Sequence, residues 1–222
     1  MPEPNSKSVD AVVRKLRSGI LRARQRGEAI GERDTIQVFI TPLLTALEWD
    51  IGDLDEVRNE YRHRSQDNPV DLALFLVRSP CLFVEAKSLN LGVDDRKWVI
   101  QTLGYAMAAG VEWCVLTNGD EYRLYNAHAS VEADEKLFRS VKLSDESMHD
   151  LTVETLCLLS KSKMSDQKLN ILWKAHFVDS KIKVALDNLI KGQDDSLVRV
   201  LRKATSKTLT TSEIKNSRSE EH

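Results

Sequence analysis

The chain has 222 residues, of which 41% are hydrophobic and 30% charged, a balance typical of a globular protein with a sizeable apolar core. This length suits one domain with an extension, and the composition excludes collagen, coiled-coil or disordered character for most of the chain. The longest apolar run, residues 72–77, has six residues, far short of the roughly 20 that a membrane-spanning helix needs.

Two features predict a cytoplasmic location. The first ten residues, MPEPNSKSVD, are polar and contain no apolar core of a signal peptide. The three cysteines, Cys81, Cys114 and Cys157, are odd in number, widely spaced and set among apolar neighbours. They are therefore interpreted as reduced core thiols, which are typical of the cytoplasm.

The net charge of −2 does not indicate a polyanion-binding protein, but the distribution of charge is uneven. Residues 7–26 hold seven basic side chains and the single acid Asp10. Apolar residues recur at helical spacing between Val9 and Ile20, so an amphipathic helix is predicted here. Its basic face is either a phosphate-binding surface or an ordinary solvated face. We prefer a DNA contact through Arg14, Arg17, Arg22 and Arg24.

The next elements alternate between helical and strand periodicity. A second helix is predicted over residues 33–47, with a kink at Pro42. Three short apolar runs, 57–61, 70–77 and 81–84, are separated by the turn signals Asn68-Pro69 and Ser79-Pro80, and they are spaced like consecutive antiparallel strands.

The rest of the chain returns to helix after a hairpin. A helix over 94–109 should stop at Gly110, and strands are predicted over 112–116, 122–124 and 137–143, the first two joined by a turn around Asn118-Gly119. Helices are expected over 145–159, 165–190 and 196–203, followed by a disordered tail from residue 205. The fold class is α/β. We divide the chain into a basic helix (1–27), a core (28–143), a helical extension (144–204) and a tail (205–222).

Three charged residues occur where neighbouring strands begin or end. Asp71 opens the apolar run 70–77, and the buried run 81–84 ends in Glu85-Ala86-Lys87. Because side chains alternate along a strand, Glu85 and Lys87 share one face. Charges at the ends of buried strands are costly to desolvate unless they pair or hold a metal.

This set of residues suits hydrolysis of a phosphodiester. Two carboxylates can hold one or two hard divalent cations, which activate water and neutralise charge on phosphate, while a lysine orients the attacking water or stabilises developing charge. The alternative is purely structural: an ion pair between Glu85 and Lys87, with Asp71 capping a turn.

Further polar residues are positioned to reach the same place. Gln101 and Tyr105 are four residues apart on the helix over 94–109, and hence on one face. They could hold a phosphate or an ordered water, or they could be core residues with a satisfied hydroxyl. Glu32, at the start of the second helix, supplies another carboxylate.

The ordered combination of these motifs resembles the PD-(D/E)xK nuclease superfamily, and within it the N-terminal nuclease domain of type I restriction enzyme R subunits and its stand-alone relatives. Residues 30–126 carry the resemblance. Its parts are Glu32-x-x-Thr35 with the apolar pattern up to Trp49, Pro69-Val70-Asp71, Glu85-Ala86-Lys87, Gln101-x-x-x-Tyr105, and Val115-Leu116-Thr117-Asn118-Gly119 with Tyr122-x-Leu124-Tyr125. The chain departs from the pattern in one inserted residue between Pro69 and Asp71, in Glu48 where the family usually has glycine, and in the lack of a helicase motor.

The resemblance implies a restriction-endonuclease-like core, a central mixed sheet flanked by helices, which here has the N-terminal basic helix and the helical C-terminal extension in addition. It implies that Asp71 and Glu85 bind Mg²⁺, with Mn²⁺ as a substitute, and that Lys87 is the catalytic lysine. Glu32 would be an auxiliary metal ligand, and Gln101 and Tyr105 would support the site or touch DNA.

Other chemistries find no support in the sequence. The histidines and cysteines lack zinc-ligand spacing, and there is no nucleotide-binding GxxxxGK[ST] loop. Basic residues around the first strand, including Arg62 and Arg64, could follow a phosphate backbone or form a solvated rim.

We therefore predict a magnesium-dependent endodeoxyribonuclease that acts in restriction of foreign DNA or in DNA processing. DNA is the expected partner, with a homodimer through the C-terminal helices and a separate specificity or motor subunit as further expectations. The alternatives are a non-cleaving nucleic-acid-binding module on the same fold and an assembly protein that works through residues 165–203.

Overall fold

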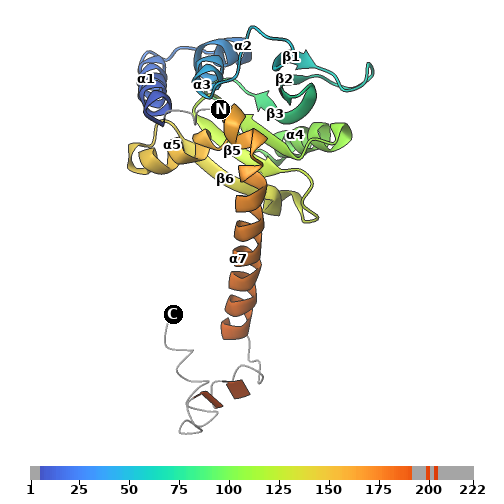
Figure 1. The fold of residues 1–222 in the computed structure, drawn as a ribbon. Coiled ribbons are helices and arrows are strands. Elements are labelled where there is room, and N and C mark those ends of the chain that lie inside the picture. The colour runs from blue at the N-terminus through green and yellow to red at the C-terminus, as the bar shows by residue number, and fades with distance from the viewer. Residues whose placement is uncertain (1–5, 192–198, 201–202, 205–222) are drawn as a thin grey trace. The chain divides into compact units, whose positions relative to one another are not determined.

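The protein was analysed as a computed structural model that describes residues 6–191, 199–200 and 203–204 (Figure 1). Six strands form one sheet in the order of the chain: β1 (Val57–Tyr61), β2 (Val70–Leu76), β3 (Ser79–Ala86), β4 (Trp113–Thr117), β5 (Glu121–Asn126) and β6 (Leu137–Lys142). All neighbouring pairs are antiparallel except β3 and β4, which are parallel. The predicted mixed sheet is confirmed.

The parallel pair requires a crossover, which helix α4 (Arg96–Ala109) supplies. Its end matches the predicted stop at Gly110, whereas it begins at Arg96 rather than at residue 94. The Asp95 side chain accepts a hydrogen bond from the backbone N–H of Lys97, and Gly110 ends the helix in the left-handed conformation with φ +69°. Val99, Leu103 and Ala106 of α4 are buried in one cluster with strand residues. Helix α4 therefore covers one face of the sheet.

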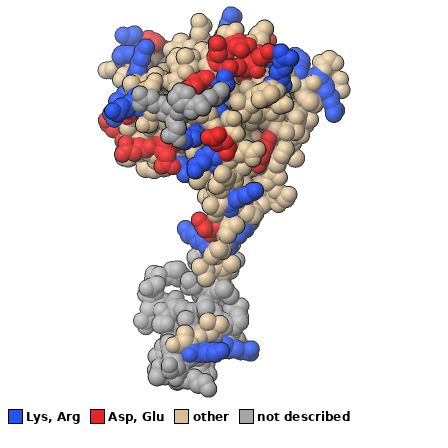
Figure 2. Space-filling model, viewed as in Figure 1, with Lys and Arg blue, Asp and Glu red and all other residues tan. Residues whose placement is uncertain are grey.

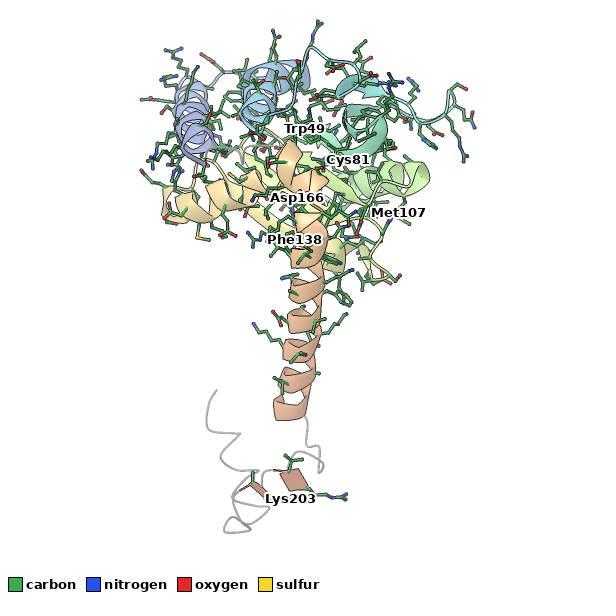
Figure 3. All side chains as sticks on the ribbon, viewed as in Figure 1. Trp49, Cys81, Met107, Phe138, Asp166 and Lys203 are labelled. Atoms are coloured by element: carbon green, nitrogen blue, oxygen red, sulfur yellow. The ribbon has the colours of Figure 1, made fainter. Side chains whose placement is uncertain are left out.

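The other helices of the described core group together on the opposite side (Figure 1). Helix α1 (Ser6–Gln25) packs against α3 (Thr41–Ala46) and α5 (His149–Cys157), and α5 packs against β6. Trp49, labelled in Figure 3, is buried just after α3, and its indole N–H donates to the carbonyl of Leu159 at 2.9 Å. Both faces of the sheet are thus covered, as the apolar strands require.

The irregularity expected at Pro42 takes the form of a widened turn. Helix α2 (Glu32–Thr35) runs through a π-helical segment, Ile36–Ile40, directly into α3, and the backbone stays right-handed throughout. A proline inside a helix lacks an N–H and crowds the carbonyl four residues earlier. A π turn accommodates this without breaking the helix.

Several predicted boundaries need correction. The turn between β2 and β3 is formed by Val77 and Arg78, both at positive φ, and β3 begins at Ser79 rather than at residue 81. The predicted helix over 145–159 is a 3₁₀ turn, Glu146–Met148, followed by α5. A short helix α6 (Lys161–Ser165), capped by the Ser160 side chain, precedes α7 (Lys168–Lys191) and was missed because it spans little more than one turn.

A short 3₁₀ helix, Ala133–Lys136, lies before β6. Residues 196–198, 201 and 202 of the predicted helix over 196–203, and the predicted tail from residue 205, lie outside the described residues. The chain divides into two compact units, Met1–Ile171 and Leu172–His222. The first unit contains the sheet, α1 and the helices up to α6.

Glu48 occupies a position that favours glycine. It follows α3 with φ +71°, a region that costs an ordinary L-residue roughly 1–2 kcal/mol. The residue that departs from the family pattern is therefore held in a conformation that glycine adopts freely.

The three cysteines are unpaired, and Cys114 is fully buried in the sheet. Among the described residues, no helix combines the length and the apolar character that crossing a membrane would require.

The turn between β4 and β5 fixes the helix that carries Glu32. Gly119 has φ +83°, and a Cβ on it would lie 2.9 Å from Thr35 Cγ2 and 3.0 Å from Phe39 Cβ. Glycine is thus required here both for its backbone conformation and for the close approach of the helix.

We expect Gly119→Ala to lower the free energy of unfolding by about 2 kcal/mol or more. The alanine would have to adopt a strained positive φ, and its methyl group would also clash with Thr35 and Phe39. Gly104→Ala in α4 is the matched control. Its Cβ would meet no atom within 4 Å, so it should raise the free energy of unfolding by roughly 0.5–1 kcal/mol. Urea denaturation measures both, and equal stability of the two variants would contradict the packing described here.

Candidate active site

The pairing of β2 with β3 brings the two predicted carboxylates together. Leu72 pairs with Val84 and Ala73 with Phe83, so the same antiparallel register sets Asp71 opposite Glu85. The Asp71 side chain accepts a hydrogen bond from the backbone N–H of Ala86 at 2.7 Å. Asp71 is the second residue of β2 and Glu85 is the last but one of β3, so the backbone of each is held by the sheet.

Lys87 completes the central group. Its ammonium donates to Glu85 Oε1 at 2.8 Å and lies 3.8 Å from Glu32 Oε2. Its backbone N–H donates to the carbonyl of Thr117 at 2.8 Å, which ties the residue to β4. Only 4% of Glu85 and 5% of Lys87 is exposed. The structure therefore holds an ion pair that is almost completely buried.

Helix α4 presents the next contacts from one face. Gln101 Nε2 donates to Glu85 Oε1 at 3.3 Å and to Tyr105 Oη at 2.6 Å. One turn earlier, the ring of Trp98 lies 4.8 Å from Lys87 Nζ, a distance suited to a cation–π contact. Of the predicted pair, Gln101 thus contacts the Glu85 carboxylate directly, and Tyr105 is linked to it through Gln101.

The environment shifts the acid–base behaviour of the site. Burial raises the pKa of Glu85 to about 7, and the neighbouring charge of Asp71 also raises it, against the hydrogen bond from Lys87. Burial also raises the pKa of Asp71. For Lys87, burial lowers the pKa, but its bond to Glu85 and the surrounding carboxylates outweigh burial and leave the pKa raised.

One atom of the site lacks a partner. Glu85 Oε2 is buried and has no hydrogen bond within the described structure. A buried carboxylate oxygen without a donor is costly, and a divalent cation would satisfy it. Within the described residues, no three His, Cys, Asp or Glu side chains form a ready ligand set. The residues present therefore fit a cation that takes Asp71 and Glu85 and completes its shell with water, as Mg²⁺ often does.

The predicted auxiliary ligand, Glu32, lies beside Lys87 and is half exposed. Two further residues near the site were not predicted. Trp98 supports the Lys87 ammonium, and its position three residues before Gln101 was the available signal. Glu60 lies in β1 with φ +47°, and its charge raises the pKa of Asp71. Nothing in the local sequence marks Glu60.

The basic side chains proposed to contact DNA divide into two groups. Arg17 is buried, where its guanidinium donates to the carbonyl of Leu143 and to His149 Nδ1. Arg24 pairs with the buried Asp120 at 2.7 Å, and Arg14 pairs with Asp10 at 2.9 Å. Arg17 therefore ties α1 to the core from a buried position. Arg24 also bonds to the core, but 38% of its side chain remains exposed.

Apart from Arg17, all of the arginines predicted to contact DNA are exposed: Arg14, Arg22, Arg24, Arg62 and Arg64. Figure 2 shows Lys and Arg side chains over α1 and over the loop between β1 and β2. In that loop the Arg62 guanidinium donates to the carbonyl of Asp67, and the backbone N–H of Arg64 donates to the Asp67 carboxylate. These contacts order the loop while leaving Arg64 turned to solvent.

Part of the chain is similar to known proteins. Residues 32–138 match the family model of the type I restriction enzyme R protein N terminus. This segment is similar to the start of a restriction-enzyme R protein. It contains all six residues predicted for the site: Glu32, Asp71, Glu85, Lys87, Gln101 and Tyr105.

Two solved structures also match the chain. A fragment of an HsdR subunit assigned to a type I restriction enzyme from Vibrio vulnificus YJ016 is 22% identical, with a TM-score of 0.39, and the match covers 57% of this chain and 26% of that one. The DrdV–DNA complex is 12% identical, with a TM-score of 0.41, and the match covers 87% of this chain and 19% of that one. The match thus spans about a quarter or less of these longer chains. No curated protein sequence matches this chain.

The raised pKa of Glu85 predicts a specific pH dependence of stability. The pKa is about 7 in the folded protein against 4.5 for an unperturbed glutamate, so the folded state binds the proton more tightly. The contribution of Glu85 to the free energy of unfolding is then fully present below about pH 4.5, and it is lost as the pH rises through 7. In metal-free protein, Glu85→Gln should remove a fall of roughly 2–3 kcal/mol between pH 5 and pH 8.

Urea denaturation in EDTA at both pH values measures this difference. Glu132→Gln, at an exposed acid outside the site, is the matched control and should follow the wild type. Parallel profiles for wild type and Glu85→Gln would show that burial does not perturb this carboxyl group.

Proposed function

We propose that the protein is a metal-dependent nuclease that hydrolyses DNA phosphodiester bonds in the restriction of foreign DNA or in DNA processing. The observation that carries the proposal is the convergence of Asp71, Glu85 and Lys87 at one end of β2 and β3, with a buried carboxylate oxygen left without a partner. The similarity of residues 32–138 to a restriction-enzyme R protein supports it.

The proposed cofactor is Mg²⁺, with Mn²⁺ as a substitute, held by Asp71 and Glu85. When bound, it would supply charge neutralisation at the phosphate. Asp71 is already oriented for this task by the backbone N–H of Ala86. Burial raises the pKa of Glu85 to about 7, and a bound cation would favour the charged form of this carboxyl group.

Lys87 is the proposed catalytic lysine. Its ammonium now pairs with Glu85 Oε1 and stands near Glu32. With a cation held by Asp71 and Glu85, the Lys87 ammonium would be free to donate to the attacking water or to a phosphate oxygen. Trp98 beneath it and Glu32 beside it keep the ammonium at the site. Gln101 positions Glu85 by a direct hydrogen bond.

DNA would approach through exposed basic side chains. Arg14, Arg22 and Arg24 on α1 can neutralise phosphates, as can Arg62 and Arg64 in the loop between β1 and β2. A homodimer through the C-terminal helices and a separate specificity or motor subunit remain predictions.

Nicking of supercoiled plasmid in Mg²⁺ or Mn²⁺ tests the proposal. Lys87→Ala should lower the cutting rate by about 100-fold or more, the scale of losing one donor to a charged transition state. Lys97→Ala is the matched control, because the Lys97 ammonium also lies over the Trp98 ring, at 4.7 Å, but has no bond to the carboxylates.

The outcomes separate the candidate functions. Cutting by wild type and Lys97→Ala alone supports the nuclease and its lysine. Equal cutting by Lys87→Ala would refute the assignment of Lys87. DNA binding without cutting in either metal would favour a non-cleaving binding module.

Metal binding gives an independent prediction. Because a ligand of the folded state stabilises it by mass action, Mg²⁺ or Mn²⁺ at about 100 times its dissociation constant should add roughly 2.7 kcal/mol to the stability. Thermal melting should show a rise in Tm for wild type and Lys87→Ala, but not for Asp71→Asn. Asp134→Asn, at an exposed acid distant in sequence, should keep the shift. A shift that persists in Asp71→Asn would place the cation elsewhere.

A further inference from the structure

A cavity of about 310 Å³ lies beside the candidate active site, between the loop joining β1 to β2 and helix α4. Residues from three strands, the loop and α4 line it, among them Tyr61, Gln66, Asn68, Phe83 and Tyr105. The proposed catalytic mechanism does not use this cavity, although its volume is in the range of small-ligand sites.

The walls of the cavity include ordered aromatic rings. Phe83 is buried. The Tyr61 ring packs edge-on against Phe75 at 5.3 Å and lies 5.9 Å from Phe83, both measured between ring centroids. Tyr105 is positioned by its hydrogen bond with Gln101. Phe83 therefore forms the base of the cavity, and the partly exposed rings of Tyr61 and Tyr105 provide surfaces on which a nucleobase can stack.

The polar rim suits an uncharged ligand. Gln66 and Asn68 are exposed, and each amide offers both a donor and an acceptor, the combination that reads the edge of a base. His63 also lines the cavity, together with Asp67. The Asp67 carboxylate accepts a hydrogen bond from the backbone N–H of Arg64. An acidic group in the lining disfavours a phosphate and favours a base with exocyclic amino donors.

The cavity is connected to the catalytic carboxylate through two hydrogen bonds. Tyr105 in the lining accepts from Gln101, and Gln101 donates to Glu85. A nucleotide whose phosphate lies at Asp71 and Glu85 would therefore have a neighbouring base within reach of the cavity. A base inside a duplex is stacked and paired, so only an unpaired or extruded base could enter.

We propose that this cavity binds an unpaired nucleobase of the DNA strand next to the phosphate being cleaved, with Gln66 and Asn68 reading its edge. The inference rests on the proposed nuclease function. It makes the loop between β1 and β2 a specificity element, and it gives the protein a preference for single-stranded or locally unpaired DNA near the cutting position.

Binding without catalysis tests the cavity directly. Single-stranded oligonucleotides carrying 2-aminopurine at successive positions are titrated with protein in EDTA, and anisotropy and base fluorescence are recorded. The double variant Gln66→Ala, Asn68→Ala should weaken binding about tenfold and abolish a fluorescence change that wild type shows at one position. Ser65→Ala, on the same loop but outside the lining, is the matched control and should behave as wild type.

The result also distinguishes this inference from the proposed function. Unchanged affinity and fluorescence in the double variant, with an unchanged Tm, would overturn the base-binding cavity even if Lys87→Ala abolishes nicking. Loss of base-dependent binding in the double variant supports the cavity. If wild type then fails to cut in either metal, the protein is a reader of unpaired DNA and the nuclease assignment fails.

Discussion

The buried pair between Glu85 and Lys87 is the interaction on which the site depends. Glu85 and Lys87 are each exposed by 5% or less, and their opposite charges are tolerated at the end of a central strand because each residue is the ion-pair partner of the other. Removing either would leave an uncompensated buried charge or force a change of protonation. The pair also leaves Glu85 Oε2 without a donor, so the arrangement is satisfied only in part.

The topology of the sheet explains how helix α4 brings further side chains to the Glu85–Lys87 pair. Because β3 and β4 are parallel, the chain must cross over between them, and α4 is that crossover. The same helix covers one face of the sheet through Val99, Leu103 and Ala106. From the same helix, Trp98 contacts Lys87 and Gln101 bonds to Glu85. Packing and site geometry are therefore properties of one element.

The N-terminal part of the chain shows a different use of charge. The basic face of α1 looks in sequence like one phosphate-binding surface, but the structure divides it. Arg17 bonds to Leu143, just after β6, and to His149 of α5, and Arg24 bonds to Asp120 in the turn after β4, because the helix docks on the core along that side. Periodicity predicts that such a helix is amphipathic, yet it does not show which arginines will find acceptors in the core.

Alternation, helical spacing and turn residues are local properties, so the six strands and the crossover helix with its stop at Gly110 could be predicted from the sequence. The same patterns set Asp71, Glu85 and Lys87 at strand ends and Gln101 and Tyr105 on one helix face. Only the tertiary structure decided which groups meet. The register of β2 on β3 set Asp71 opposite Glu85, and the path of α4 brought Trp98 to Lys87. The same holds for Glu60 beside Asp71, for the buried arginine of α1, and for the cavity between a loop and α4. These are contacts between segments distant in the chain, and their formation depends on the packing of the whole sheet.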